Sequence, residues 1–269
     1  MAETKAIAAE LMELLGTGRQ VRPFSARDPG FGLAQAYDVV AEVRAMRVAR
    51  GETPVGRKIG FTNTTIWQHY GVSGPMWNYV FDTTLRDLAA TGGTFTLAGL
   101  AEPRIEPEIV LHLARAPKAG MSEDELLGCV DWIAHGFEIV HCCFPGWVFI
   151  IADTAAAYGL HGALLLGPRH AVERDRAAWG SALRTFSLAL HRDGSPVAEG
   201  HARNVLGGPL GALRFLVEEI ERTRPCDALR ASEIVTTGTL TDAQQIEAGS
   251  VWTTVLCGID LGGLRIGFR

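Results

Sequence analysis

A pair of glutamates interrupts a strongly apolar segment, which reads Pro103-Arg104-Ile105-Glu106-Pro107-Glu108-Ile109-Val110-Leu111-His112-Leu113. Successive side chains of a strand point to opposite faces, so Glu106 and Glu108 would share one face while Ile105 and Ile109 occupy the other. Two ionised carboxylates at this spacing repel each other and lose hydration on burial, so they need a proton, a cationic side chain or a metal ion nearby. The pair therefore belongs either to a cation site or to a solvated strand face.

A third glutamate has a similar setting. Glu138 stands between Phe137 and Ile139, in a run from Gly136 to His141 whose alternation predicts a half-buried strand. Hard divalent cations such as Mg²⁺ and Mn²⁺ take oxygen ligands from a few carboxylates and leave other positions to water and substrate. Three glutamates on two neighbouring strands thus indicate a shared Mg²⁺ or Mn²⁺ site. An outward-facing Glu138 on an amphipathic strand is the alternative that alternation leaves open.

One lysine lies in a short predicted strand. Lys58 stands between Gly56 and Gly60, where a long cationic side chain either reaches the surface or enters a polar cavity. In a cavity lined by metal-bound carboxylates, it would bind a substrate carboxylate or transfer protons. A surface position is the simpler alternative for Lys58.

The composition limits the class of protein. The chain has 269 residues, 47% of them hydrophobic and 20% charged, which is ordinary for a globular enzyme with a sizeable core. Its net charge of −5 provides no basic footprint for nucleic acid. The first residues do not resemble a secretory signal, and the apolar runs are too short to cross a membrane. Five cysteines without a C-x-x-C pair fit a reducing compartment, so we expect a cytoplasmic protein that binds neither nucleic acid nor membrane.

The periodicity of apolar residues predicts an α+β protein. Helices are predicted over 3–15, 33–49 and 209–222, and after Ser122, which with Glu125 has the pattern of a capping box. Strands are predicted over 55–61, 103–113, 136–141, 184–191, 233–239 and 252–259, with a hairpin turn at Asp193-Gly194. We expect an N-terminal helical subdomain over 1–95 and a β-rich catalytic core over 96–269, joined as one integrated domain.

The order of several short motifs resembles the fumarylacetoacetate hydrolase superfamily. In chain order they are Gly56-Arg57-Lys58-Ile59-Gly60-Phe61-Thr62, Tyr70-Gly71-Val72, Pro103-Arg104-Ile105-Glu106-Pro107-Glu108-Ile109, Glu138, Asp153-Thr154, Leu206-Gly207-Gly208-Pro209-Leu210 and Thr237-Gly238. Each motif is weak alone, but the ordered combination covers nearly the whole chain. The branch that it resembles most is that of the 2-oxopent-4-enoate hydratases and 4-oxalocrotonate decarboxylases of catechol meta-cleavage pathways, which break down aromatic compounds.

The resemblance implies a β-rich fold with an N-terminal helical layer, and Mg²⁺ or Mn²⁺ held by Glu106, Glu108 and Glu138. It implies a homo-oligomeric lyase for a small unsaturated 2-oxo acid, and a complex with another pathway enzyme is compatible with it. The cation would stabilise the enolate that forms at C2 during reaction at C3. Lys58 matches the lysine that these enzymes place near the substrate for acid–base or electrostatic work. The residues expected to bind substrate are Thr62, Asp153, His161 and Gly238.

Two departures from the family pattern leave the reaction open. Met76 stands where the hydratases have an aspartate and the decarboxylases an apolar residue, and Met76 cannot act as a base. Asp82 is the candidate replacement, although it could equally cap a turn in Phe81-Asp82-Thr83-Thr84. The segment 156–160 also differs from both branches, at the distal end of the expected pocket. Hydration and decarboxylation both stay open, and the alternatives are an acylpyruvate-type C–C hydrolase and a non-catalytic partner subunit of a hydratase–decarboxylase complex.

Overall fold

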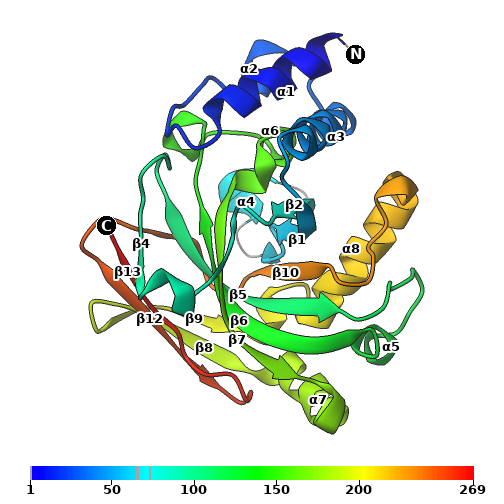
Figure 1. Ribbon diagram of the computed structural model, residues 1–269, viewed down its shortest axis with the longest axis vertical. Helices are drawn as coiled ribbons and strands as arrows, with labels where there is room; N and C mark the ends of the chain where they lie inside the picture. Colours follow the sequence, from blue (N-terminus) through cyan, green and yellow to red (C-terminus); the bar gives the residue numbers. More distant parts are fainter. Residues whose placement is uncertain (1, 65–66, 73) are drawn as a thin grey trace.

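Two β-sheets and a group of helices make up the molecule (Figure 1), for which a computed structural model describes residues 2–64, 67–72 and 74–269. The larger sheet has the strand order β2 (Met76–Phe81), β1 (Pro54–Gly60), β10 (Ile234–Thr239), β5 (Arg104–Leu113), β6 (Val130–Val140), β7 (His161–Ala171) and β3 (Leu85–Asp87), with β11 (Gln244–Gln245) beside β5. The smaller sheet has the order β4 (Thr94–Phe95), β13 (Arg265–Phe268), β12 (Val251–Cys257), β8 (Ser187–Arg192) and β9 (Ser195–His201). The mixed architecture confirms the expected α+β class.

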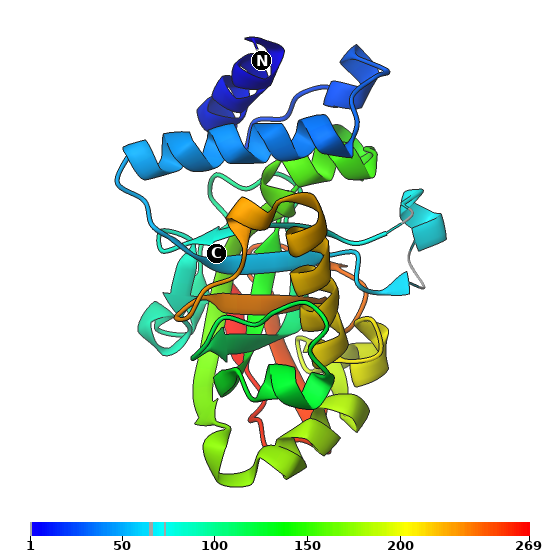
Figure 2. The ribbon, with the colours of Figure 1, turned by 90° about the vertical axis from the view of Figure 1, so that its right-hand side faces the viewer.

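A helical layer covers one end of the larger sheet (Figure 2). It consists of α1 (Ala2–Leu14), α2 (Phe24–Arg27), α3 (Leu33–Ala49) and α6 (Ile151–Ala156). Ile7 and Leu11 recur at helical spacing on α1 and lie in one buried cluster with Val39 and Val43 of α3. The predicted helices over 3–15 and 33–49 are therefore confirmed, and their apolar stripes hold the layer together.

The apolar face of β5 forms part of the main core. Ile105, Ile109 and Leu111 are fully buried, as the alternation predicts. Three helices on this side of the sheet add residues to the same cluster: α5 (Glu123–Leu127), α7 (Arg176–Thr185) and α8 (Pro209–Thr223). Because this face is filled with apolar side chains, the opposite face of β5 is left for the polar side chains of the strand.

One predicted strand begins too early. Arg184 and Thr185 belong to α7, and β8 starts only at Ser187, so the prediction over 184–191 is wrong at its N-terminal end. The side chain of Asp175 caps α7 by accepting a hydrogen bond from the Ala178 amide at 3.2 Å. Buried apolar residues one turn apart, Trp179 and Leu183, then keep the helix on the core. Tertiary packing thus overrides the local alternation.

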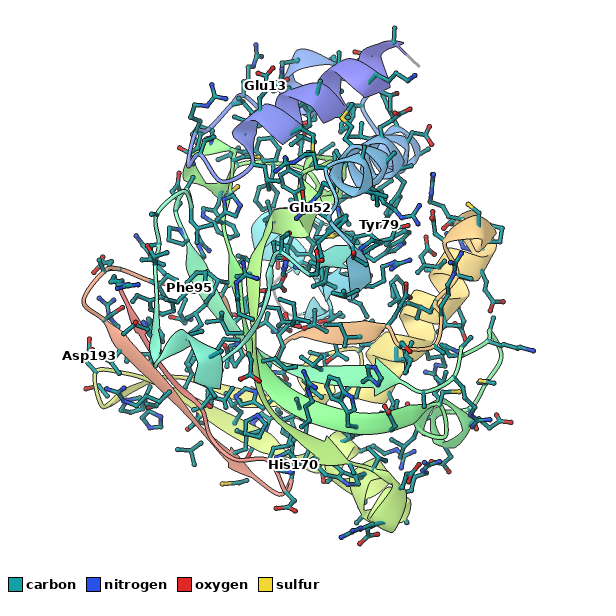
Figure 3. All side chains as sticks on the ribbon, in the orientation of Figure 1. Glu13, Glu52, Tyr79, Phe95, His170 and Asp193 are labelled. Atoms are coloured by element: carbon teal, nitrogen blue, oxygen red, sulfur yellow. The ribbon has the colours of Figure 1, made fainter. Side chains whose placement is uncertain are left out.

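The other predicted elements are present, although the strand predicted over 136–141 is the C-terminal part of β6, which begins at Val130, and the strand predicted over 252–259 ends at Cys257. Ser122 and Glu125 form the capping box of α5, and α8 fills the range predicted over 209–222. The turn at Asp193-Gly194 joins β8 to β9 at the outer edge of the smaller sheet (Figure 3). In the described part of the chain, no helix combines the length and hydrophobicity needed to cross a membrane.

The larger sheet takes strands from both sides of residue 95. Strands β1, β2 and β3 come from the N-terminal part of the chain and lie in the same sheet as β5, β6 and β7. Strand β1 pairs in parallel with β10, so Lys58 lies beside Thr236 from the C-terminal part of the chain. The division into 1–95 and 96–269 remains a prediction about domains, whereas the sheet itself is continuous across it.

Candidate metal centre

Three glutamate side chains converge on the polar face of the larger sheet. Glu106, Glu108 and Glu138 each offer an oxygen that lies within 4.8 Å of the other two. The register explains this, because β5 and β6 pair antiparallel with Glu106 directly opposite Glu138, and Glu108 lies two residues further along the same face. Three carboxylate oxygens at this spacing suit one divalent cation, with positions left over for water and substrate.

Hydrogen bonds fix one oxygen of each buried carboxylate. His161 Nδ1 lies 2.7 Å from Glu138 Oε1, while His161 Nε2 lies 2.9 Å from Thr84 Oγ1. The Gly238 amide donates to Glu108 Oε2 at 2.8 Å, and the Thr236 hydroxyl donates to the same oxygen. Glu108 Oε1 is buried without a hydrogen-bond partner among the described residues. A buried carboxylate oxygen of this kind needs a partner, and a cation held by the three glutamates would supply one.

Lys58 is a buried residue, so the surface alternative is excluded. Its side chain is 3% exposed, and Nζ lies 3.1 Å from Glu138 Oε2 and donates to the Gly159 carbonyl at 3.0 Å. Burial acts to lower the pKa of Lys58, but the charges of Glu138, Glu106 and Glu108 outweigh it and raise that pKa above its ordinary value. The ammonium group therefore stays charged beside the glutamates.

The three carboxyl groups titrate differently because their partners differ. Burial is the largest influence on each and acts to raise its pKa. It raises the pKa of Glu106 to about 7 despite the charge of Lys58, and it raises the pKa of Glu108 well above the ordinary value, with the charge of Glu138 adding to the effect. For Glu138, the charge of Lys58 and the hydrogen bond from His161 outweigh burial and lower the pKa to about 2. Burial without a cation therefore favours the protonated forms of Glu106 and Glu108.

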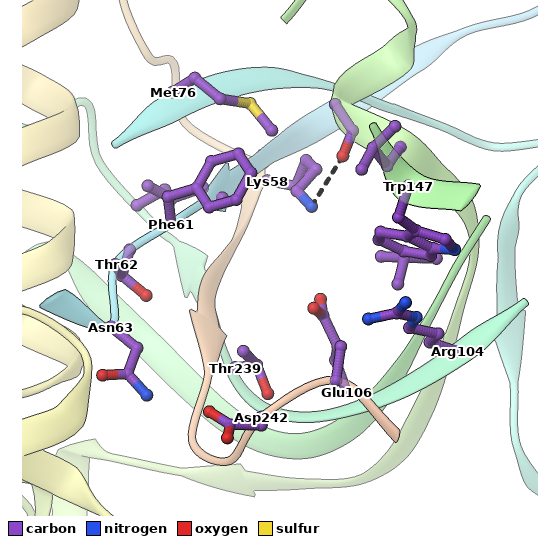
Figure 4. A pocket seen from close by; sticks show the side chains of 16 residues that line it. Lys58, Phe61, Thr62, Asn63, Met76, Arg104, Glu106, Trp147, Thr239 and Asp242 are labelled. Carbon is purple, nitrogen blue, oxygen red and sulfur yellow. Dashed lines mark hydrogen bonds between the residues drawn. The ribbon is translucent and has the colours of Figure 1, made fainter. Parts of the chain in front are cut away.

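One of the three glutamates, Glu106, lines a cavity of about 450 Å³ (Figure 4). Its lining includes Lys58, Thr62, Met76, Glu106, Gly159 and Leu160, together with residues that the sequence had not singled out: Phe61, Asn63, Arg104, Trp147, Thr239 and Asp242. Alternation along β5 could have identified Arg104, because it shares the face of Glu106 and Glu108. The sequence carries no comparable signal for Trp147, the last residue of a short 3-10 turn, or for Asp242, which reaches the cavity from a loop.

Two of the expected substrate-binding residues, Thr62 and Gly238, lie next to each other beside the glutamates. The hydroxyl of Thr62 lines the cavity and is buried, with no hydrogen-bond partner among the described residues. Gly238 has φ +97°, and a Cβ atom there would lie only 1.9 Å from Thr62 Oγ1. A larger residue at 238 is therefore excluded both by its backbone conformation and by Thr62. His161, a third candidate, contacts Glu138 and thus positions a glutamate instead of lining the cavity.

Asp153 is a structural residue in this fold. It lies fully buried in the first turn of α6 and accepts hydrogen bonds from the Ser25 amide at 2.9 Å, the Ser25 hydroxyl at 2.5 Å and the Ile150 amide at 2.9 Å. Its carboxylate therefore caps α6 and ties α2 to it. The residue is absent from the cavity lining, so the expected contact with substrate is not seen in the structure.

Asp82 is absent from the cavity lining, which argues against its assignment as a catalytic base. Met76 begins strand β2 and lines the cavity. Asp82 follows the other end of β2, roughly 20 Å from Met76 along an extended strand. The Asp82 carboxylate is exposed and accepts hydrogen bonds from the amides of Thr53 at 3.0 Å and Thr83 at 2.8 Å. Asp82 therefore caps a turn, the alternative that the sequence had left open.

Comparison with known sequences gives distant relatives that align over nearly the whole chain. No family model matches. A 2-keto-4-pentenoate hydratase from Paraburkholderia xenovorans is 28% identical over 265 residues, which are 97% of this chain and 93% of the relative. A 4-oxalocrotonate decarboxylase from a Pseudomonas species is 27% identical over 247 residues, which are 90% of each chain.

Comparison with solved structures identifies the fold. The 4-oxalocrotonate decarboxylase from Pseudomonas putida G7, complexed with magnesium and adipate, matches with a TM-score of 0.89 at 22% identity, over 100% of this chain and 98% of that one. A fumarylacetoacetate hydrolase family protein from yeast matches with a TM-score of 0.57 at 12% identity, over 79% of this chain and 91% of that one. The chain is thus a homologue of 2-keto-4-pentenoate hydratases and 4-oxalocrotonate decarboxylases with the fold of the fumarylacetoacetate hydrolase superfamily, which confirms the resemblance seen in its sequence.

Proposed function

We propose that this chain is a Mg²⁺- or Mn²⁺-dependent lyase for a small unsaturated 2-oxo acid of the 2-oxo-4-pentenoate or 4-oxalocrotonate type. The observation that carries the proposal is the buried Oε1 of Glu108, which has no hydrogen-bond partner among the described residues. This oxygen lies beside Glu106 and Glu138, and Glu106 lines a cavity large enough for such an acid. The relatives named as hydratases and decarboxylases, and the related fold solved with magnesium, support it. A cytoplasmic homo-oligomer is part of the proposal and is supported by the sequence pattern alone.

In this proposal, the cation is held by Glu106, Glu108 and Glu138, and Lys58 is the proton donor. A divalent cation at this site would supply electrostatic stabilisation of an enolate. The Lys58 ammonium, fixed by Glu138 and the Gly159 carbonyl, is suited to donate a proton to the substrate oxygen at C2. Thr62 offers its buried hydroxyl to the substrate, whereas His161 and Gly238 keep two of the glutamates in position.

Met76 favours decarboxylation among the possible reactions. Its side chain is 1% exposed and forms part of the cavity wall beside Gly60 and Gly159, so it presents an apolar surface and no base. In 2-oxohex-3-enedioate the C5–C6 bond would break, CO₂ would leave, and the electron pair would move through the double bond to the oxygen at C2. Protonation of that oxygen gives 2-hydroxypenta-2,4-dienoate. This step needs an electron sink and a proton donor but no activated water.

Hydration is a second candidate because a carboxylate other than the glutamates lines the cavity. Asp242 is exposed and belongs to the loop that follows β10. In the balanced sequence the C2 hydroxyl of the dienoate loses a proton and C5 gains one, which gives 2-oxopent-3-enoate. Water then adds to C4, Asp242 could take the proton that this water loses, and C3 gains a proton, giving 4-hydroxy-2-oxopentanoate. A non-catalytic partner subunit, by contrast, would keep the cation site without turnover.

Product analysis tests these proposals. Purified protein with Mg²⁺ is incubated separately with 2-hydroxypenta-2,4-dienoate and 2-oxohex-3-enedioate, and products are followed by ultraviolet absorption and NMR. We expect the diacid to release CO₂ only in the presence of Mg²⁺. Formation of 4-hydroxy-2-oxopentanoate from the dienoate would instead support hydration. If the protein consumes neither substrate, the lyase proposal is contradicted.

A further inference from the structure

A second cavity, of about 340 Å³, lies behind β1, on the face of the larger sheet opposite the glutamates. Arg57 and Lys58 are neighbours on β1, so their side chains point to opposite faces, and Arg57 lines this second cavity. Tyr79 stands directly opposite Arg57 on β2 and lines the cavity as well. The two cavities share no lining residue, so the second one is separate from the site assigned to the 2-oxo acid.

Arginines reach the second cavity from three different elements. Arg44 belongs to α3, Arg57 to β1, and Arg230 to the loop before β10. Two of them contact the ring of Tyr79, which is labelled in Figure 3. The Cζ atoms of Arg57 and Arg44 lie 3.9 and 5.2 Å from the centre of this ring. Two positive charges are therefore held beside one ring, although they repel each other.

The two acidic residues of the lining already have partners. Glu233 Oε1 lies 3.1 Å from Arg57 Nη1. Asp227 accepts hydrogen bonds from the Tyr79 hydroxyl at 2.7 Å and from Arg224 Nε at 3.1 Å. Arg224 lies outside the lining, so Asp227 is neutralised by a cation that does not face the cavity.

The other two arginines of the lining lack a counter-charge. Among the described residues, the side chains of Arg44 and Arg230 make no ion pair and no hydrogen bond. Arg44 is half-buried, and its Nε atom, like that of Arg57, is buried without a hydrogen-bond partner in this part of the structure. A buried N–H of a charged group needs an acceptor. An anion in the cavity would supply the acceptor and balance the excess positive charge.

From this arrangement we infer that the cavity behind β1 binds a phosphate group, with Arg44 and Arg57 as its principal ligands. Donors from three elements suit the oxygens of a tetrahedral anion, whereas a single arginine fork is enough for a planar carboxylate. The cavity is larger than inorganic phosphate requires, so a phosphate monoester fits as well. The inference does not depend on the reaction proposed for the glutamate cavity.

The first test is calorimetric titration of the Mg²⁺-loaded protein with inorganic phosphate and, separately, with glycerol 3-phosphate. We expect saturable binding of both, and the tighter of the two distinguishes free phosphate from an organic phosphate. Arg44→Met should weaken binding by about 10- to 100-fold, the value of a charge-assisted hydrogen bond. Arg222→Met is the matched control, because it removes an exposed arginine that pairs with Glu219, and it should leave the affinity unchanged.

A free cysteine gives a readout at the cavity itself. Cys226 is exposed and lines the cavity, whereas Cys257 is exposed at the end of β12 in the other sheet. At a phosphate concentration about ten times the Kd, alkylation of Cys226 by neutral iodoacetamide should slow about tenfold, because few sites stay empty. Alkylation of Cys257 should not change. Arg44→Lys keeps the charge but loses the planar fork, so it should retain part of the protection, and it serves if the methionine variant does not fold.

Three results would overturn the inference. The first is the absence of saturable binding of either phosphate compound to the unaltered protein. The second is equal affinity in Arg44→Met and the unaltered protein, which would place the anion elsewhere. The third is competition between phosphate and a 2-oxo acid in the presence of Mg²⁺, which would place the phosphate at the glutamates. Failure of the lyase assay would leave this inference intact.

Discussion

The ammonium nitrogen of Lys58 lies 3.1 Å from Oε2 of Glu138, and both side chains are buried. Burying an ion pair carries a desolvation cost, so removal of one partner leaves an uncompensated charge. The same contact fixes Nζ at the cavity that we assign to the substrate. The stability of the fold and the proposed chemistry therefore both depend on Lys58, and experiment can separate these two roles.

Lys58→Met should destabilise the protein and abolish turnover. We expect the free energy of unfolding to fall by about 3 kcal/mol, because Glu138 loses its buried cation. Loss of a proton donor typically lowers kcat by about 10²- to 10⁴-fold. Thermal unfolding and steady-state kinetics measure the two effects. A variant that is destabilised but keeps its kcat would show that Lys58 serves the fold and not the reaction.

Glu108→Gln should remove cation binding while preserving the fold. The amide oxygen of glutamine can still accept hydrogen bonds from Gly238 and Thr236, but the amide NH₂ group would occupy the place of Oε1 and repel a cation. Calorimetric titration with Mg²⁺ should show at least about 100-fold weaker binding, because loss of even a hydrogen-bond partner of a metal ligand typically costs about 10- to 100-fold in metal affinity. Glu218→Gln, an exposed glutamate on α8, is the matched control and should bind Mg²⁺ normally. Normal Mg²⁺ affinity in Glu108→Gln would contradict the proposed ligand set.

Binding of Mg²⁺ should release protons and weaken at acidic pH. The pKa of Glu106 is raised to about 7, first by burial, so its folded-state pKa lies above the value in the unfolded chain. The metal-free folded state then binds more protons than the unfolded state between about pH 4.5 and 7, and its stability falls as pH rises through this window. A cation that replaces the proton should restore that stability.

Titrations in buffers of different ionisation enthalpy measure this proton release. Below about pH 7 the apparent Mg²⁺ affinity should fall steadily, because the carboxyl group of Glu106 must lose its proton before it can bind a cation. An affinity that stays constant from pH 5 to 8, with no buffer-dependent enthalpy, would contradict the assignment of Glu106 as a ligand.

The local part of the site could be predicted from the sequence, and the long-range part could not. Alternation correctly places Glu106 and Glu108 on one face, because the period of a strand is a local property. The direct pairing of Glu106 with Glu138, and the neighbourhood of Lys58, depend on strand register and on a parallel pairing between distant segments. Only the order of the motifs, which resembles the family pattern, indicated that these distant segments form one site.

The roles of polar residues outside the site could likewise not be predicted from the sequence. Asp82 and Asp153 lie near family motifs and read as candidates for chemistry, yet both cap backbone amides. A carboxylate that accepts amide hydrogen bonds and one that serves a reaction look alike in a sequence. Only the partner groups, which tertiary structure provides, distinguish them.

Asp82→Asn tests the revised role of this residue. The amide oxygen of asparagine can still accept from Thr53 and Thr83, so stability should fall by no more than about 1 kcal/mol and activity should remain. Asp82→Ala, which removes the cap, should cost more stability but leave kcat unchanged in the folded protein. A large drop in kcat with an intact fold would restore Asp82 as a catalytic residue.

Asp153→Asn should weaken the attachment of the helical layer without affecting the chemistry. The carboxylate accepts from Ser25 through both oxygens and from the Ile150 amide, so replacing one oxygen by an NH₂ group sets a donor against a donor in a buried position. We expect a loss of about 2 to 3 kcal/mol in the free energy of unfolding, measured by urea denaturation, with KM unchanged. Ser25→Ala removes the hydroxyl donor alone and should cost about 1 kcal/mol, and the double variant should cost less than the sum because the two residues share one contact. A rise in KM without loss of stability in Asp153→Asn would instead support the contact with substrate that the sequence had predicted.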